Sequence, residues 1–344
     1  MNVFELDLTV NSPFRLESGV ILPQLRLRTT IYGRLNGDKS NAIHVFHALT
    51  GSSRIADWWP GMIGDGKALD TSKHAFICIN YIGSCYGSTS AADIESVVTT
   101  NDIIRSQAVV FEYLGIKRFD AVIGASVGGM LALQFAVDFP GLANKVISIG
   151  AAPLSAMGLA LNHIQRKALD IENDVNLARQ VATLSYKSHE ILEQSYGRNP
   201  NRNGEVPHDS VDARFDVAGY LDHQGQTFTK RFDVDSFRLI TKAMDLFDIS
   251  DDQIARITAG VTLIGISSDW LFPASDVQRL AERLKKRGKD AEYILFDSKD
   301  GHDAFLSDID GISGIIKPIL SREHVKLVGD VSGSSVRRLF RIAA

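Results

Sequence analysis

The chain has 344 residues, of which 44% are hydrophobic and 23% are charged, and its net charge at pH 7 is −4. This composition is ordinary for a globular protein, and the length allows one large domain or a domain with an insertion. The charge provides no basic surface for nucleic acid or for an anionic membrane. No apolar run approaches the roughly 20 residues that a membrane-spanning helix needs.

The amino-terminal residues lack the basic and then apolar pattern of a signal peptide. Cys78 and Cys85 are the only cysteines, which argues against a disulfide-stabilised scaffold and fits a reducing compartment. Neither these cysteines nor the His, Asp and Glu residues show the spacing of a metal site. We therefore expect a soluble cytoplasmic protein without metal, nucleic-acid or membrane partners.

Strand-like and helix-like segments alternate along the first part of the chain. Residues 14–18 and 25–32 alternate in polarity, which predicts an antiparallel start to a sheet. The next expected elements are strands at 42–46 and 75–79, a helix at 103–114, a strand before Ser126, a helix at 128–139 and a strand at 145–149. This alternation predicts a mostly parallel sheet with helices on both faces.

The segment Gly124-Ala-Ser-Val-Gly128 is a G-x-S-x-G motif between an apolar run and a helix-like stretch. It has the form of a nucleophile elbow, in which a sharp strand-to-helix turn exposes a serine hydroxyl above the sheet edge. Small residues suit such a turn because bulky neighbours would clash. Serine alone is a weak nucleophile, so the motif requires a base and an orienting acid elsewhere.

The alternation stops between about residues 153 and 255, where the chain is largely helical and lacks strong strand signals. The simplest interpretation is a helical lid inserted over Ser126. The α/β core then comprises residues 1–152 and 256–344. The tail from about residue 322 is basic, and the sequence assigns it no role.

Two later strands are followed by polar residues that complete a catalytic triad. Asp269 follows a buried strand at 261–267, and His302 follows a strand at 291–296. Taken singly, Asp269 resembles a loop or helix-capping carboxylate and His302 a surface histidine. Together with Ser126 they give the order Ser, Asp, His of α/β-hydrolases, each residue lying just past a strand end. We therefore predict Ser126, Asp269 and His302 as nucleophile, orienting acid and base.

Longer motifs around these positions resemble the homoserine O-acyltransferase family of the α/β-hydrolase fold. The similar stretches are His47-Ala-Leu-Thr-Gly51 and residues 57–59, 64–71, 80–89, 126–130, 220–225, 243–247, 268–273 and 301–305. The resemblance extends from about residue 14 to residue 320. It implies an acyltransferase of methionine synthesis that uses acyl-CoA, most simply acetyl-CoA, as co-substrate and holds no bound cofactor. It also implies a homodimer formed through the lid helices.

The mechanism implied by the resemblance agrees with general acyl-transfer chemistry. Ser126, deprotonated by His302, attacks the thioester of acyl-CoA, and Asp269 fixes the imidazole tautomer. The backbone N–H groups of Leu49 and Val127 are the expected oxyanion hole, where loss of one donor costs about 2.7–4 kcal/mol. The acceptor hydroxyl then takes the acyl group, so we expect ping-pong kinetics.

An amino-acid acceptor needs an anion for its ammonium group and a cation for its carboxylate. In the family, the position of Asp303 contacts the substrate amine. Arg179 lies in a stretch that resembles a lid helix of the family. Arg179 and Tyr186 share a helix face, because they are seven residues apart, and a guanidinium can hold a carboxylate through two parallel bonds. The competing interpretations are a loop carboxylate for Asp303 and a solvated arginine for Arg179.

Several alternatives remain open from the sequence. Residues 161–179 form a shorter segment than in typical members, and Ser90-Ala-Ala92 replaces a usual Gly-Pro. The acceptor is therefore homoserine, serine or another hydroxylated compound, and the donor is acetyl-CoA or succinyl-CoA. An esterase or thioesterase, in which water resolves the acyl-enzyme, is a second class. A non-catalytic binding protein is a third, but it has no need for the three triad residues together.

Overall fold

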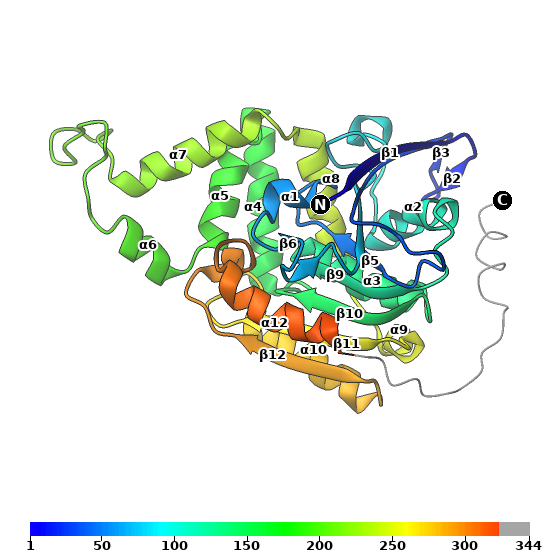
Figure 1. Cartoon of the computed structure of the whole chain (residues 1–344). Coiled ribbons are helices and arrows are strands. Elements are labelled where there is room, and N and C mark those ends of the chain that lie inside the picture. Colours follow the sequence, from blue (N-terminus) through cyan, green and yellow to red (C-terminus); the bar gives the residue numbers. More distant parts are fainter. Residues whose placement is uncertain (323–344) are drawn as a thin grey trace.

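An eight-stranded sheet forms the centre of the molecule (Figure 1), whose computed structural model describes residues 1–322. The basic tail beyond residue 322 lies outside the described residues. The strands, in spatial order, are β1 (Val3–Val10), β4 (Leu25–Tyr32), β8 (Ala75–Ile79), β5 (Ala42–Phe46), β9 (Phe119–Ala125), β10 (Ala143–Ile149), β11 (Gly260–Ile266) and β12 (Ala291–Phe296). Only the β1–β4 and β4–β8 pairings of this sheet are antiparallel, whereas the pairings from β8 to β12 are parallel.

Helices cover both faces of the sheet, and alternate residues of the strands pack against them. In β9, Val122 belongs to the apolar cluster of one face, whereas Ile123 belongs to that of the other. On the first face lie α2 (Thr100–Tyr113), α3 (Val127–Asp138) and α10 (Ala274–Lys286); on the second lie α1 (Ile55–Trp58), α11 (Ala304–Ser307) and α12 (Ile309–Ser321). Two short 3₁₀ helices, η1 (Ala91–Asp93) and η2 (Gly301–Asp303), complete these connections. The predicted mostly parallel sheet with helices on both faces is confirmed.

The start of the sheet differs from the prediction. Residues 25–32 form β4, as expected, but their antiparallel partner is β1 rather than the segment at 14–18. Phe14–Arg15 forms β2, which pairs with β3 (Ile21–Leu22) in a separate two-stranded sheet. A second small sheet joins β6 (Ile63–Gly64) to β7 (Leu69–Asp70). Alternating polarity identifies a strand but not its partner, and here a hairpin separates the two paired segments in the sequence.

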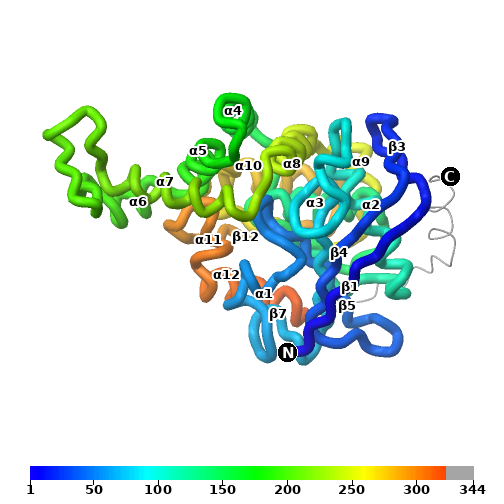
Figure 2. Tube along the Cα trace, turned by 90° about the horizontal axis from the view of Figure 1, so that it is seen from above, coloured from blue at the N-terminus to red at the C-terminus, as the bar shows by residue number. Residues whose placement is uncertain are grey.

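Six helices lie between β10 and β11, and we call this segment the helical insertion. They are α4 (Ala156–Glu172), α5 (Asn176–Tyr186), α6 (His189–Ser195), α7 (Asp216–Thr229), α8 (Val234–Leu246) and α9 (Asp251–Arg256). Figures 1 and 2 show α6, α7 and the loop between them projecting from one end of the molecule. By contrast, α8 contacts α2 and α9 contacts α3, so the last two helices pack on the core.

Side-chain caps define where several of these helices begin. The hydroxyl of Ser155 accepts a hydrogen bond from Gly158 at the start of α4, and Ser188 caps α6 in the same way. Asp233 caps α8, and Ser250 forms a capping box at α9. Such caps satisfy backbone N–H groups that have no partner within the helix.

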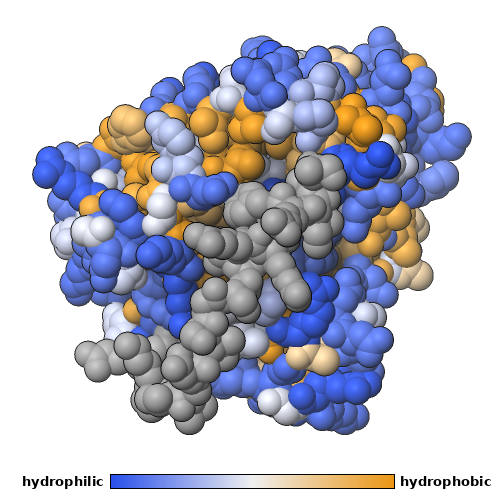
Figure 3. Space-filling model, turned by 90° about the vertical axis from the view of Figure 1, so that its right-hand side faces the viewer, coloured by the Kyte–Doolittle hydropathy of each residue, from blue (hydrophilic) through white to orange (hydrophobic). Residues whose placement is uncertain are grey.

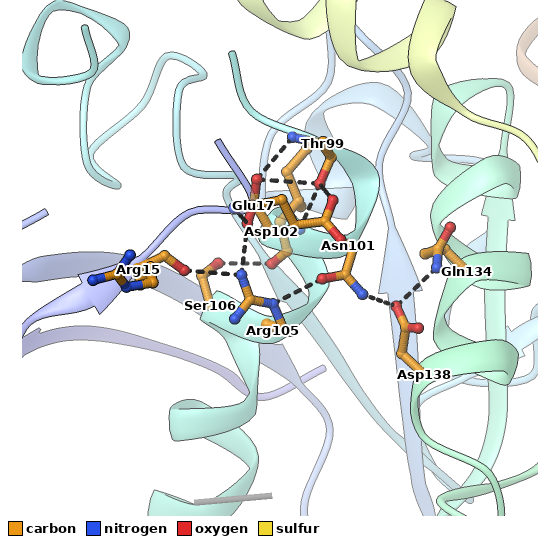
Figure 4. A network of polar contacts seen from close by, with 10 residues as sticks. Arg15, Glu17, Thr99, Asn101, Asp102, Arg105, Ser106, Gln134 and Asp138 are labelled. Carbon is orange, nitrogen blue, oxygen red and sulfur yellow. Dashed lines mark hydrogen bonds and ion pairs between the residues drawn. The ribbon is translucent and has the colours of Figure 1, made fainter. Parts of the chain in front are cut away.

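A buried polar network fastens α2 to its surroundings (Figure 4). Asp102, which has no exposed surface, accepts hydrogen bonds from the backbone N–H of Glu17 and from the guanidinium group of Arg105. On the other side of the helix, Asn101 donates to Asp138 at the end of α3. Burial raises the pKa of Asp138. The network joins the amino-terminal segment, α2 and α3, the helix that begins at the elbow.

Part of the hydrophobic surface remains exposed. The edge strand β1 leaves Val3 and Phe4 more than half exposed, and Figure 3 shows a band of hydrophobic residues across the upper half of one face.

Within residues 1–322, no helix is long and apolar enough to cross a bilayer. The same residues contain no group of three or more His, Cys, Asp or Glu side chains that could hold a metal ion.

The strand-to-helix turn after β9 depends on direct contact between backbones. A Cβ atom at Gly124 would lie 2.1 Å from the carbonyl oxygen of Gly128. A Cβ atom at Gly128 would lie 2.4 Å from the carbonyl oxygen of Phe46, at the end of β5. Backbone atoms cannot move aside as a flexible side chain can, so both positions of the motif require glycine for steric reasons.

We expect Gly128→Ala to destabilise the protein by about 2–4 kcal/mol, because the new methyl group meets the Phe46 carbonyl. Gly314→Ala is the matched control, since Gly314 is also helical and a Cβ there would meet nothing within 4 Å. The control should stabilise the protein by about 0.5–1 kcal/mol, the usual gain of alanine over glycine in a helix. Urea unfolding of both variants measures the difference, and equal effects would contradict this account of the turn.

Candidate active site

Ser126 occupies the sharp turn between β9 and α3. Its backbone has φ 58° and ψ −128°, a conformation that residues other than glycine rarely adopt. The Ser126 N–H donates a hydrogen bond to Ile149 O at 2.9 Å, which fixes the turn to the neighbouring strand β10. Backbone strain of this kind costs about 1–3 kcal/mol and concentrates at functional sites. The geometry agrees with the predicted nucleophile elbow.

Asp269 and His302 are in direct contact with each other. His302 Nδ1 lies 2.6 Å from Asp269 Oδ2, and both side chains are almost completely buried. The other carboxylate oxygen, Oδ1, accepts hydrogen bonds from the backbone N–H groups of Leu271 and Phe272, each at 2.9 Å. The carboxylate is therefore held in one orientation and can fix the tautomer and direction of the imidazole.

A second set of bonds joins the loops that carry these two residues. The hydroxyl of Ser268 donates to Ser298 O at 2.6 Å and accepts a hydrogen bond from the N–H of Gly301 at 2.9 Å. Ser268 directly precedes the aspartate, and Gly301 directly precedes the histidine. The bonds hold the loops after β11 and β12 in a fixed relation, which keeps the Asp–His contact short.

The end of β10 brings the serine turn next to this pair. A Cβ atom at Gly150 would lie 3.5 Å from both Asp269 Oδ2 and His302 Cε1. Gly150 directly follows Ile149, which accepts the bond from Ser126 N–H. His302 Nε2 is buried and has no hydrogen-bond partner within residues 1–322. The structure thus gathers the three predicted triad residues at one sheet edge and leaves the outer imidazole nitrogen uncommitted.

The electrostatic surroundings of His302 favour its protonated form. Burial lowers the pKa of His302, but the charge and hydrogen bond of Asp269, with a contribution from Asp303, raise it above the ordinary histidine value. By contrast, burial lowers the pKa of His47 to about 4, so that this histidine stays neutral. His302 is the better candidate for a group that accepts a proton and holds it.

The loop after β5 supplies the second expected oxyanion donor. Neither Leu49 N–H nor Val127 N–H donates a hydrogen bond to another residue in the described part of the chain. The loop is held by the ring of His47, which stacks on Tyr81 at 3.8 Å, and by Tyr81 OH, which donates to His47 O at 2.5 Å. Two backbone donors therefore remain available near Ser126, as an oxyanion hole requires.

Helix α5 places Arg179 and Tyr186 beside His302. The rings of Tyr186 and His302 have centroids 5.6 Å apart, and the Arg179 guanidinium lies 5.6 Å from the Tyr186 centroid. Arg179 also lies over the ring of Phe228 in α7, at 5.0 Å. Within residues 1–322 it forms no ion pair, and its Nε is buried without a partner. A cation without a counter-ion therefore stands close to the candidate base.

Burial varies along α5. Ala182 and Thr183, which lie between Arg179 and Tyr186 in the sequence, are buried, whereas Leu184 is 45% exposed. Burial raises the pKa of Tyr186 to about 12, against the opposing charge of Arg179. Tyr186 is therefore a hydrogen-bond donor throughout the physiological pH range.

Asp303 forms an ion pair that the sequence analysis missed. Its Oδ2 lies 3.0 Å from Lys187 Nζ, and each side chain is 21% exposed. Burial lowers the pKa of Lys187, but the charge of Asp303 and the hydrogen bond between the two side chains have the larger effect. The pKa of Lys187 is therefore raised above the ordinary lysine value. Asp303 Oδ1 forms no hydrogen bond with another described residue. Lys187 directly follows Tyr186 in the sequence, yet only the tertiary structure brings it to the residue after His302.

Comparisons with known proteins agree with this geometry. The family model described as alpha/beta hydrolase fold matches residues 41–308. A homoserine O-acetyltransferase of Geobacter sulfurreducens is 34% identical to this chain, over 93% of it and 98% of the relative. The crystal structure of homoserine O-acetyltransferase from Bacillus anthracis superposes with a TM-score of 0.86 at 23% identity, covering 94% of this chain and 99% of that one. Esterase E22 superposes almost as well, with a TM-score of 0.84 at 21% identity, covering 93% and 100%. The likeness to solved structures therefore shows the fold and does not by itself separate transferase from esterase.

The Asp269 contact should govern the pH dependence of acylation. If His302 accepts the serine proton, the rate rises with pH through the raised pKa of His302, because only the neutral imidazole is a base. Asp269→Asn removes the charge that raises this pKa, so the midpoint should move to lower pH while the rate falls by about 10⁴-fold.

The acylation rate with p-nitrophenyl acetate, measured across pH, tests this expectation. Asp252→Asn is the control, because it makes the same chemical change on the exposed start of α9. A midpoint that Asp269→Asn leaves in place would remove His302 as the titrating group.

Proposed function

Because this chain belongs to the homoserine O-acetyltransferase family of α/β-hydrolases, we propose that it transfers an acetyl group from acetyl-CoA to the hydroxyl group of L-homoserine. This reaction would place the enzyme in methionine biosynthesis. Ser126 attacks the thioester, His302 takes the serine proton, and Asp269 stabilises the imidazolium that results. The backbone N–H groups of Leu49 and Val127 stabilise the tetrahedral oxyanion.

The second half-reaction regenerates Ser126. As CoA leaves, His302 gives the serine proton to its sulfur atom and becomes neutral again. His302 then removes the proton from the homoserine hydroxyl, and the resulting oxygen attacks the acyl-enzyme. The proton then passes from His302 to Ser126 Oγ as the ester leaves. Donor and acceptor therefore react in separate steps, which gives ping-pong kinetics.

The guanidinium group of Arg179, which forms no ion pair within residues 1–322, is the observation that favours an amino acid over water as acceptor. A cation without a counter-ion near the base is a binding site for an anion, and the homoserine carboxylate supplies one. The Tyr186 hydroxyl provides a further donor. A hydrolase that uses water has no need for such a cation.

Asp303 is the proposed partner of the substrate ammonium group. Lys187 already pairs with its Oδ2, so the substrate would bind through Oδ1. The cation of Arg179 and the anion of Asp303 then match the two charges of a zwitterionic amino acid. Their placement around His302 directs the side-chain hydroxyl, rather than the amine, toward the acyl-enzyme.

The location and assembly of the enzyme stay predictions. We propose a cytoplasmic homodimer formed through the helical insertion. Met157, Ile164 and Ile171 support the dimer, because they are spaced by seven residues along α4 and are each more than half exposed. The mass of the protein in solution, from sedimentation velocity, tests this assembly.

Release of CoA tests the proposed reaction. The assay uses acetyl-CoA or succinyl-CoA, each with homoserine, with serine and without acceptor. We expect acetyl-CoA turnover that depends on homoserine, with parallel double-reciprocal plots. Ser126→Ala should form no labelled acyl-enzyme from radioactive acetyl-CoA. CoA release that is independent of the acceptor would replace this proposal by a thioesterase, and a preference for succinyl-CoA or serine would correct the substrate.

Arg179→Ala should raise the KM for homoserine by about 10- to 100-fold, because charge-assisted hydrogen bonds contribute about 1.5–3 kcal/mol. The KM for acetyl-CoA should change little, since the donor reacts before the acceptor binds. Arg198→Ala is the control, because Arg198 also lies over an aromatic ring of the helical insertion, at 5.2 Å from Phe215. An equal effect of Arg179→Ala on both KM values would reject the carboxylate contact.

A further inference from the structure

An open groove of about 600 Å³ lies apart from the candidate triad residues Ser126, Asp269 and His302. One wall is the loop after β8, and the other is the connection between α7 and α8. We call it the loop groove, and its lining residues are Arg26, Ser84, Cys85, Tyr86, Gly87, Ser88, Ser90, Thr229, Lys230, Arg231, Phe232 and Asp233.

The first wall presents backbone donors that lack acceptors. The N–H groups from Cys85 to Ser88 donate no hydrogen bond to another residue in the part of the chain that the structure describes. Tyr86 and Gly87 have successive positive φ values of 77° and 103°. Consecutive N–H groups in such turns form concave sites that bind anions. Most backbone N–H groups of folded proteins are paired, so this run of free donors suits an external acceptor.

A side chain of the same wall is also unpaired. Ser84 is 3% exposed, and its hydroxyl has no hydrogen-bond partner within residues 1–322. A buried hydroxyl without a partner is costly. The hydroxyl adds a further donor to the free backbone N–H groups of this loop.

The opposite wall supplies positive charge. Lys230 and Arg231 are exposed and form no ion pair within the described residues. Arg26 contributes a third cation, although it already pairs with Asp93 at 2.7 Å. The only carboxylate among the lining residues is Asp233, which is occupied in capping α8 and in accepting from Cys85 Sγ at 3.1 Å. The loop groove therefore combines free donors with a surplus of positive charge.

Arg231 connects the loop groove to the candidate active site. Its Nη1 donates to Thr50 O at 2.8 Å and to Tyr86 OH at 3.0 Å. Thr50 directly follows Leu49, one of the two expected oxyanion donors. An anion bound in the loop groove would thus lie beside the loop that receives the reacting carbonyl.

We propose that the loop groove binds the phosphate groups of the acyl-CoA donor. This inference rests on the proposed function, because acyl-CoA carries its thioester at one end of a flexible arm and its phosphates at the other. The free N–H groups and Lys230 hold the phosphates, and the arm passes the loop of Thr50 to reach Ser126. Phosphates thereby position the thioester without taking part in the chemistry.

Two donors with the same thioester test the inference. Acetyl-CoA carries the phosphates, whereas acetyl-pantetheine lacks them. Lys230→Glu should lower the ratio of kcat/KM for acetyl-CoA to that for acetyl-pantetheine by about tenfold or more, because it replaces an attraction by a repulsion. Lys286→Glu, the same change at an exposed position of α10, should leave the ratio unchanged. An unchanged ratio in Lys230→Glu would overturn the proposal.

A binding measurement gives an independent readout. Adenosine 3′,5′-bisphosphate should compete with acetyl-CoA in the unsubstituted enzyme and in Lys286→Glu, and it should inhibit Lys230→Glu at least tenfold more weakly. Equal inhibition of all three proteins would place the phosphates elsewhere.

The unsubstituted enzyme separates this inference from the proposed function. Hydrolysis of p-nitrophenyl acetate without any turnover of acetyl-CoA would reject the proposed function, and the phosphate site with it. Turnover of acetyl-CoA with homoserine, combined with an unchanged donor ratio in Lys230→Glu, would reject the phosphate site alone.

Discussion

The close approach of three backbone segments at the elbow is the constraint on which the site depends. The carbonyl of Gly128 lies where a side chain at Gly124 would stand, and the carbonyl of Phe46 lies where one at Gly128 would stand. This packing forces Ser126 into its positive φ and sets α3 directly against the end of β5. The loop that follows β5 carries Leu49, so the same contact that presents the nucleophile also positions an expected oxyanion donor.

The parallel sheet brings residues that are distant in the sequence to one edge, and a helix of the helical insertion contacts the loops at that edge. Strands β9, β11 and β12 end at a common edge, where short loops carry Ser126, Asp269 and His302. A Cβ atom at Gly301 would lie 2.6 Å from Tyr186 O, so α5 ends in contact with the histidine turn. The end of α5 therefore lies directly against the turn that carries the candidate base. In the proposed function, the core carries the catalytic residues and the insertion carries the residues that bind the acceptor.

The strand-end residues were accessible from the sequence, because hydrophobic runs show where strands end and parallel strands end together. The segments at 42–46, 75–79 and 291–296 match the observed strands β5, β8 and β12. The pairing of Asp303 with Lys187 was not accessible, because it joins a loop of the core to the end of an insertion helix. The partner of β4 was also missed: the sequence analysis placed strand-like segments at 14–18 and 25–32 and did not identify β1 (Val3–Val10) as a strand.

Phe228 lies between the residues of the two proposed substrate sites in the contact network. The guanidinium groups of Arg179 and Arg231 each lie 5.0 Å from its ring centroid, and a quadrupolar ring attracts both cations. The Arg179 guanidinium also lies over the ring of Tyr186, which contacts His302. Arg231 instead donates a hydrogen bond to Thr50 O and lines the loop groove. Attraction to the same buried ring thereby offsets part of the repulsion between these two like charges. Because α7 carries Phe228 and leads into Arg231, the proposed acceptor and donor sites share one structural support.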